Sequence, residues 1–446
     1  MADTYDLLLR GGAVVSHRGV ETADIGVRDG RTAAIGDLTA ASAAEVVDAA
    51  GLHVLPGVID TQVHFREPGN EHKEDLEAGS RGAVLGGVTA VFEMPNTAPL
   101  TVTAEALADK LRRAKDRMWC DHAFYMGATA ENADALGELE RLPGCCGVKI
   151  FMGASTGDLL TEDDATLRRI LAAVRRRCAV HAEDEPRLQE RFALAEAAAD
   201  PAAHPDWRDT EVALRATRRL IAIARETGAR VHVLHITTAD EMRFLAEHKD
   251  IASVEATPQH LTLAAPECYA ELGTRAQMNP PIRDRGHRDG LWWGVDQGVV
   301  DVIGSDHAPH TLEEKARTYP ASPSGMPGVQ TLLPIMLDHV NAGRLSLLRL
   351  VDLTSAGAAR LFGIAGKGRI AVGHDGDFTL VDLAARRRIS DEMMANRSGW
   401  TPFDGRQVTG WPMATVIRGR VVMRDGELAN LASGRPMRFG DTLRPV

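Results

Sequence analysis

Short apolar runs alternate with amphipathic segments through most of this chain. Eight runs rich in apolar and β-branched residues lie at 53–60, 89–94, 122–127, 147–152, 178–182, 230–236, 251–256 and 299–305. The segments between them have apolar residues at helical spacing and acidic residues near several starts; examples are 103–118, 162–177, 210–227 and 239–249. This alternation predicts a parallel sheet, and the number of units favours a (β/α)8 TIM-like barrel over a doubly wound sheet.

The two ends of the chain have a different pattern from the middle. Residues 5–35 and 369–428 both read as short strands separated by glycine turns. We expect the two ends to pair into one small composite β-sandwich. The predicted domains are therefore 1–55 together with 368–446 for the β-sandwich, and 56–367 for the barrel.

The composition indicates a large soluble enzyme. With 446 residues, 44% hydrophobic and 25% charged, the chain can bury a barrel-sized core and a smaller one. The net charge is −11, from 51 Lys and Arg against 62 Asp and Glu, and no basic block stands out, which argues against a nucleic-acid partner. The five cysteines form no C-x-x-C pair, and no signal peptide or membrane-spanning run is visible. We expect a cytoplasmic protein with reduced thiols and no membrane association.

Polar residues recur where the predicted barrel strands end. They are His64, Asn96, Lys149, His181, His235 and Asp306. Strand ends of such a barrel converge on one mouth, where the active site is built. A lone His there is more often structural, and a lone Asp is more often a helix N-cap, but a set matching six strands favours a shared site. Imidazoles and a carboxylate suit Zn²⁺, whereas an ammonium group cannot bind a cation.

Two segments that carry candidate site residues resemble motifs of cyclic amidohydrolases. Leu-Pro-Gly-Val-Ile-Asp-Thr-Gln-Val-His-Phe-Arg-Glu-Pro-Gly (55–69) resembles the first metal motif of that family, and its Arg-Glu-Pro-Gly ending is similar to the dihydroorotase version. Gly-Val-Lys-Ile-Phe-Met-Gly (147–153) resembles the segment whose lysine takes up carbon dioxide as a carbamate. Gly-Ser-Asp-His-Ala-Pro-His (304–310) follows the eighth predicted strand. The resemblance covers nearly the whole chain and agrees with the barrel and the composite small domain.

The resemblance implies two zinc sites that share a carboxylated Lys149. It assigns His181 and His235 to the second metal, and Gln62, His64 and Asp306 to the first, with Asp306 also the catalytic general base and acid. The family usually has His-x-His where this chain has Gln62-Val63-His64. A neutral amide oxygen is a poorer zinc ligand than imidazole, so Gln62 is expected to be a weak or absent ligand. We therefore expect one tightly bound zinc ion and a second only at high metal concentration.

Arg66, Asn96 and His310 are candidates for binding an anionic substrate. The planar guanidinium group of Arg66 suits a carboxylate, and Asn96 lies in Glu-Met-Pro-Asn-Thr after the second predicted strand. The alternative interpretations are a surface salt bridge for Arg66 and a turn residue for Asn96. In dihydroorotases the matching positions hold the substrate carboxylate, and the resemblance implies the same here.

Two further segments, 255–262 and 278–283, resemble the seventh-strand region of the same family. The resemblance implies that Asn279 contacts the substrate ring and that His260 lines the pocket. The glycine-rich loop 322–331 could offer backbone groups to the ring, although it also reads as an ordinary connection. His232 is predicted to be structural and to point away from the face that carries His235, three residues later on the same run.

The resemblance predicts a metal-dependent dihydroorotase of pyrimidine biosynthesis, which interconverts dihydroorotate and N-carbamoyl-aspartate. One alternative is a hydantoinase or allantoinase, against which Arg66 and Asn96 argue. Another is a non-catalytic dihydroorotase-like partner of aspartate transcarbamoylase, which Gln62 favours. Lys149, His181, His235 and Asp306 argue against that scaffold. A small-molecule substrate and a homo-oligomer are expected.

Overall fold

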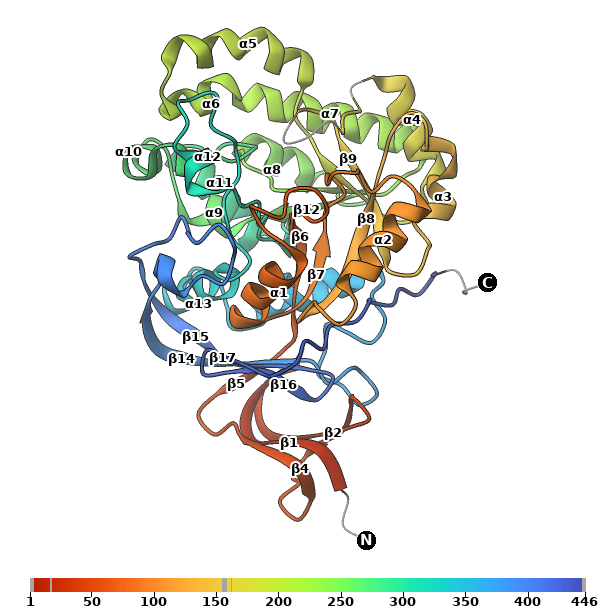
Figure 1. Cartoon of the computed structure of the whole chain (residues 1–446), viewed down its shortest axis with the longest axis vertical. Coiled ribbons are helices and arrows are strands. Elements are labelled where there is room, and N and C mark those ends of the chain that lie inside the picture. Colours follow the sequence, from red (N-terminus) through yellow and green to blue (C-terminus); the bar gives the residue numbers. More distant parts are fainter. Residues whose placement is uncertain (1–3, 17, 155–158, 162, 443–446) are drawn as a thin grey trace.

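The protein consists of a barrel and a sheet that lies below it in Figure 1. The computed structural model describes residues 4–16, 18–154, 159–161 and 163–442. The first residue of the helix expected at 162–177 and the outermost residues of both predicted terminal segments lie outside these ranges. Among the described helices, none is long and apolar enough to cross a membrane.

Eight parallel strands form a nearly closed barrel, as the sequence pattern predicted. They are β6 (Val58–Val63), β7 (Val88–Glu93), β8 (Asp121–Gly127), β9 (Cys145–Phe151), β10 (Cys178–His181), β11 (Val231–Val233), β12 (Ala252–Ala256) and β13 (Val302–Ile303). Each pairs with its neighbour in chain order. The first and last strands meet where the backbone N–H of His64 donates to the carbonyl of His307 at 2.7 Å.

Helices surround the barrel strands. They are α1 (Leu76–Leu85), α2 (Ala104–Ala114), α3 (Leu136–Leu139), α4 (Asp164–Ala173), α5 (Glu185–Ala198), α6 (His204–Trp207), α7 (Thr210–Thr227), α8 (Ala239–Ala246), α9 (Pro258–Thr262), α10 (Glu267–Leu272), α11 (Arg285–Asp296), α12 (Leu312–Lys315), α13 (Leu332–Asn341), α14 (Leu347–Val351) and α15 (Gly357–Phe362). The polar residues at predicted helix starts are N-caps: Asp163, Asp209 and Thr238 each accept a backbone N–H of the first turn. The apolar faces of the helices pack against the outside of the barrel strands, and together they form the largest core cluster.

The two ends of the chain form one nine-stranded mixed sheet. Its strands are β1 (Thr4–Ser16), β2 (Gly19–Arg28), β3 (Arg31–Gly36), β4 (Ser42–Asp48), β5 (His53–Pro56), β14 (Phe378–Arg388), β15 (Gln407–Ile417), β16 (Arg420–Arg424) and β17 (Glu427–Leu428). β5 joins the ends, because it pairs with β1 on one side and β14 on the other. The run predicted as one strand at 53–60 is therefore two strands, and the break falls at Gly57.

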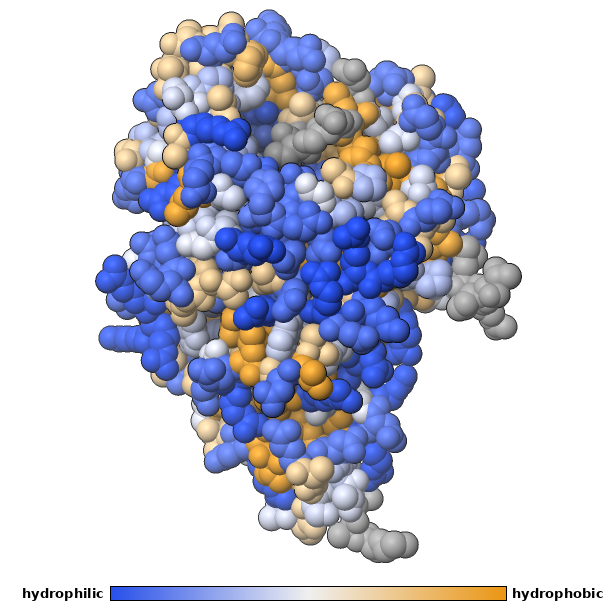
Figure 2. Space-filling view, in the orientation of Figure 1, coloured by the Kyte–Doolittle hydropathy of each residue, from blue (hydrophilic) through white to orange (hydrophobic). Residues whose placement is uncertain are grey.

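The C-terminal segment returns from this sheet to both ends of the barrel. Near its end, the carbonyl of Arg435 accepts the backbone N–H of His122 at 3.0 Å, at the start of β8. Before β15, Trp400 is fully buried and its Nε1 donates to the carbonyl of His310 at the mouth, at 2.8 Å. The terminal segment thus helps to position a predicted site residue. Figure 2 shows mostly hydrophilic residues over the barrel on this face.

Candidate active site

The predicted site residues gather at the carboxyl ends of the barrel strands. Gln62 lies in β6, Lys149 lies in β9 and His181 ends β10, whereas His64, Asn96, His235 and Asp306 follow their strands. Three of them, Arg66, His235 and Asp306, have positive φ angles of 63°, 36° and 45°. Residues other than glycine rarely adopt this conformation, and its cost of about 1–3 kcal/mol is usually found at functional sites. The positive φ angles therefore occur at residues that the sequence analysis had already predicted for the site.

One group of side chains centres on Asp306. Its Oδ1 accepts a hydrogen bond from Gln62 Nε2 at 2.9 Å and lies 3.2 Å from His64 Nε2. The other ring nitrogen of His64 lies 2.9 Å from Asn96 Oδ1. Burial lowers the pKa of His64 to about 4, so the ring is neutral near pH 7. When Nδ1 donates to Asn96, the Nε2 lone pair faces the carboxylate, and such an arrangement suits a cation between them.

A second group pairs His181 with His235. His181 Nδ1 lies 3.0 Å from His235 Nε2, and His181 Nε2 lies 2.9 Å from Glu183 Oε2. Arg208 Nε contacts both oxygens of Glu183, at 3.1 and 3.2 Å. Burial alone would raise the pKa of Glu183, but Arg208 and His181 hold it well below its ordinary value. An anchored carboxylate of this kind orients a metal-binding histidine.

Sequence reasoning missed Glu183 and Arg208. The spacing His-x-Glu at 181–183 was a local indication of the first, because a carboxylate two residues from a candidate ligand can reach its second nitrogen. Arg208 lies 25 residues further along the chain, and only the fold brings it to Glu183.

Lys149 lies between the two groups. Its Nζ is buried without a hydrogen-bond partner, as are Gln62 Oε1 and His235 Nδ1. Burial lowers the pKa of Lys149 to about 7. The three site histidines His64, His181 and His235 have pKa values lowered first by burial, with the nearby charge of Lys149 as a smaller cause. Unpartnered buried polar atoms are costly, so these three atoms, one of them Lys149 Nζ itself, indicate a place where a further group binds.

The donor set fits a metal only when Lys149 takes part. Within the described ranges, no three His, Cys, Asp or Glu side chains are grouped to hold a metal ion by themselves. Each group offers two such donors: His64 with Asp306, and His181 with His235. A carboxylated Lys149 would add an oxygen ligand to each pair and would remove the unpartnered amine.

Two buried carboxyl groups lie below these residues, and sequence reasoning did not single them out. Glu255 Oε2 accepts a hydrogen bond from Thr61 Oγ1 at 2.7 Å, and burial raises the pKa of Glu255 to about 8. Asp60 Oδ1 accepts the backbone N–H groups of Gln62 and Ser305, at 3.1 and 2.9 Å. Asp60 therefore ties the end of β6 to the end of β13 and holds Gln62 beside Asp306.

The expected orientation of His232 was wrong. Its Nδ1 lies 2.8 Å from Ser253 Oγ, and its Nε2 lies 3.4 Å from Glu255 Oε2, below the site. β11 ends at Val233, and His235 has a positive φ angle. The alternation of a strand therefore no longer relates the two histidines.

Arg66 and His310 lie side by side at the edge of the site. Arg66 Nη2 is 3.3 Å from His310 Nε2, and Arg66 Nε donates to the carbonyl of Pro309 at 3.2 Å. Among the residues that the structure describes, no carboxylate lies within ion-pair distance of this buried guanidinium group. Burial lowers the pKa of Arg66 to about 10, so it remains cationic near pH 7. A buried cation without a directly paired carboxylate offers an anion site.

Lys73 also borders this group, which the sequence did not indicate. Its Nζ lies 3.3 Å from His310 Nδ1 and 3.1 Å from Glu314 Oε1. Burial lowers the pKa of His310 to about 3, so the ring is neutral. A neutral imidazole accepts at only one nitrogen, so the tautomer decides whether His310 accepts from Lys73 at Nδ1 or from Arg66 at Nε2.

Asn279 lies next to a cavity of about 600 Å³ that Trp207, Arg208 and residues 320–324 also line. Its Oδ1 lies 3.0 Å from His204 Nε2, which positions the amide. The glycine-rich loop predicted at 322–331 thus lines the cavity with its first residues only. His260 has both nitrogens engaged: Nδ1 is 2.8 Å from Thr257 Oγ1, and Nε2 is 3.0 Å from the carbonyl of Pro280.

Comparison with known proteins identifies the family. The model of the Amidohydrolase family matches residues 53–422. The chain belongs to the amidohydrolase family. It is 39% identical over 399 residues to the dihydroorotase of Halobacterium salinarum, and this alignment covers 88% of this chain and 91% of that protein. It is 35% identical over 453 residues to the allantoinase of Rubrobacter xylanophilus, and this alignment covers 97% of this chain and 98% of that protein.

A solved structure agrees with this membership. The L-hydantoinase (dihydropyrimidinase) from Arthrobacter aurescens superposes with a TM-score of 0.93 at 32% identity, over 97% of this chain and 99% of that one. The amidohydrolase relatives named here all hydrolyse cyclic amides, so this chain is a cyclic amide hydrolase that acts on a small molecule. The amidohydrolase family is generally metal-dependent, which agrees with the donor groups around Lys149.

Proposed function

We propose that this enzyme is a dihydroorotase of the cytoplasm, which reversibly hydrolyses the cyclic amide of dihydroorotate to N-carbamoyl-aspartate. The observation that carries the proposal is the buried guanidinium group of Arg66, which has no carboxylate partner in the described part of the chain. Dihydroorotate carries a carboxylate on its ring, whereas dihydrouracil, hydantoin and allantoin do not. A substrate carboxylate would neutralise Arg66 and accept charge-assisted hydrogen bonds from it.

We propose that Zn²⁺ is held by His181, His235 and carboxylated Lys149, with His64, Asp306 and the weak ligand Gln62 available for a second ion. When bound, the metal supplies Lewis-acid polarisation of the amide carbonyl and of water. Asn96 and Glu183 would orient the ligand histidines through their second nitrogens.

The proton steps fall to Asp306. Its carboxylate accepts a proton from the attacking water as the water oxygen bonds to the amide carbon. The same proton then passes to the ring nitrogen as the carbon–nitrogen bond breaks. Gln62 Nε2 donates to Oδ1 of this carboxylate and holds it in place, which leaves Oδ2 for the proton. Arg66 and His310 hold the substrate carboxylate during both steps, and Asn279 contacts the ring.

The test compares substrates that differ only in the carboxylate. We expect kcat/KM to be higher for dihydroorotate than for dihydrouracil. Arg66→Ala should lower kcat/KM for dihydroorotate by a factor that corresponds to about 2–4 kcal/mol of transition-state binding, because a charge-assisted contact is lost. The same substitution should change the slow turnover of dihydrouracil little. Faster turnover of hydantoin, dihydrouracil or allantoin by the wild type would instead assign the enzyme to the hydantoinases or allantoinases.

We also propose a homo-oligomer. The alternative of a non-catalytic scaffold for aspartate transcarbamoylase is supported only by Gln62. Metal content per chain and dihydroorotate turnover, measured on one sample, separate the two. A metal-free, inactive protein that binds a transcarbamoylase stably would favour the scaffold.

A further inference from the structure

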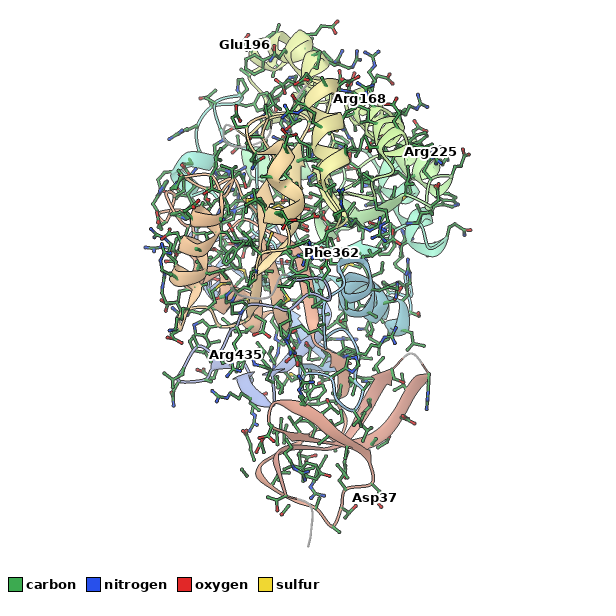
Figure 3. The ribbon with its side chains drawn as sticks, turned by 90° about the vertical axis from the view of Figure 1, so that its right-hand side faces the viewer. Asp37, Arg168, Glu196, Arg225, Phe362 and Arg435 are labelled. Atoms are coloured by element: carbon green, nitrogen blue, oxygen red, sulfur yellow. The ribbon has the colours of Figure 1, made fainter. Side chains whose placement is uncertain are left out.

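A cavity of about 270 Å³ lies at the end of the barrel opposite the active site. It adjoins the start of β10, whose far end carries His181. Phe362, labelled in Figure 3, forms part of its wall. Five arginines line it: Arg175, Arg176, Arg177, Arg230 and Arg360. The single acidic residue in the lining is Asp441.

Two of these arginines already have carboxylate partners. Arg176 Nη2 lies 2.7 Å from Asp441, and the same guanidinium group donates to the carbonyls of Glu140 and Cys145 at 2.7 Å each. Arg360 lies 3.3 Å from Asp352. These two side chains are part of the framework of the cavity.

The other three have no carboxylate within ion-pair distance in the part of the chain that the structure describes. The guanidinium group of Arg175 donates to the carbonyls of Ala172 and Val174 near the end of α4, and its backbone N–H donates to Glu140 Oε1. Arg177 Nη1 donates to the carbonyl of Val231 at 2.9 Å, but its Nε is buried without a partner. Arg230 is exposed, and its charge acts directly on Arg177.

This grouping is electrostatically unfavourable as it stands. Burial lowers the pKa of Arg177 to about 10, and the charge of Arg230 is the second cause. Like charges held around one cavity repel, and Arg177, the most buried of the three, has no paired carboxylate in the described part of the chain and keeps a buried Nε without a partner. The chain as a whole has a net charge of −11, so a local excess of three unpaired cations does not follow from composition. A bound anion would remove the conflict.

We propose that this cavity binds the phosphate group of a small phosphorylated molecule. Guanidinium groups match phosphate oxygens in planar pairs of hydrogen bonds, and a dianion neutralises more of the cluster than one carboxylate would. The cavity is too small for a folded partner but holds a phosphate with a small organic substituent. The site is separate from the catalytic mouth, so the inference does not depend on the substrate of the enzyme.

Calorimetric titration of the full-length enzyme tests the proposal. The probes are inorganic phosphate and ribose 5-phosphate, at constant ionic strength with chloride as the only other anion. We expect one saturable site per chain for ribose 5-phosphate. Inorganic phosphate should compete for the same site, since the phosphate group is the shared chemistry. Arg230→Gln should weaken binding by at least about tenfold, as expected for one lost charge-assisted hydrogen bond.

Two control variants make the result specific. Arg225→Gln removes the same charge shortly before Arg230 in the chain, but Arg225, labelled in Figure 3, is exposed and pairs with Asp250. It should leave phosphate binding unchanged. Arg66→Ala should also leave it unchanged, because Arg66 lies at the other end of the barrel. The proposal is overturned if neither probe binds saturably, if Arg230→Gln binds like the wild type, or if Arg66→Ala abolishes binding.

Discussion

Gln62 is the residue on which the number of metal ions depends. Its amide nitrogen donates to Asp306, and its amide oxygen, buried and unpartnered, is a poorer zinc ligand than imidazole. We expect the isolated enzyme to hold one metal ion tightly per chain, and a second only at high metal concentration. Gln62→His should tighten the second site. Calorimetric titration of the metal-depleted wild type and variant measures both affinities.

Gln62→Ala is the matched control, because it removes the amide without adding a ligand. It should leave the tight site unchanged and should not tighten the weak one. Two equally tight sites in the wild type would contradict this prediction, since they would show that the amide oxygen binds as well as imidazole.

Metal binding is also expected to depend on Lys149. Its Nζ has no hydrogen-bond partner, and a carbamate there would provide ligands to both histidine groups. Lys149→Ala should therefore lose metal and activity, and a short carboxylic acid added to the buffer should restore both in part. Metal content after dialysis and turnover are the two measurements. A variant that keeps its full metal content would show that Lys149 is not a ligand.

Individual site residues were predictable from the sequence where they sit in motifs at strand ends. His64, Lys149, His181 and Asp306 all follow from that pattern, and the structure brings them together. Arg208 was not predictable, because its role depends on a contact that only the tertiary fold creates. The ligand roles themselves stay predictions.

At the scale of elements, the strand count was predictable because apolar runs and helical periods alternate clearly. The division of 53–60 into β5 and β6 was not. A change of sheet leaves the run largely apolar, and only the pair Pro56-Gly57 interrupts it. A Cβ atom there would lie 2.4 Å from Thr89 Oγ1, so the chain passes too close to β7 for a larger residue.

The packing of α1 against the first metal motif gives an element-scale prediction. A Cβ at Gly79 would lie 2.4 Å from the ring of Phe65, the neighbour of Arg66, whereas a Cβ at Gly82 would meet Gln330 at an ordinary 3.4 Å. Gly79→Ala should cost about 1–3 kcal/mol of stability through overpacking. Because the displaced ring adjoins Arg66, it should also raise KM for dihydroorotate.

Gly82→Ala is the control in the same helix. It should stabilise the protein by about 0.5–1 kcal/mol, because alanine favours a helix over glycine, and should leave KM unchanged. Urea unfolding and steady-state kinetics distinguish the two variants. Equal effects of both substitutions would show that the contact with Phe65 is not the cause.

For the whole molecule, a buried ion cluster joins the barrel to the terminal sheet. Lys367, after α15, has its Nζ 2.7 Å from Asp121 of β8 and also pairs with Asp377, next to β14. Burial alone would lower the pKa of Lys367, but Asp377 and Asp121 raise it above its ordinary value. The lysine therefore stays charged. Its loss would leave Asp377 buried without an ion-pair partner among the described residues, and Asp121 with Arg418 as its remaining cation.

Lys367→Met should lower the free energy of unfolding by about 3–5 kcal/mol, because removing one partner of a buried ion pair leaves the opposite charge buried without compensation. Arg424→Met is the control: Arg424 pairs with Glu45 within the terminal sheet, but both side chains are about half exposed, at 45% and 47%. That substitution should cost under about 1 kcal/mol. Urea unfolding followed by tryptophan fluorescence measures both. If the two variants lose the same small amount, the cluster does not hold the barrel and the sheet together, and their apolar contacts alone must do so.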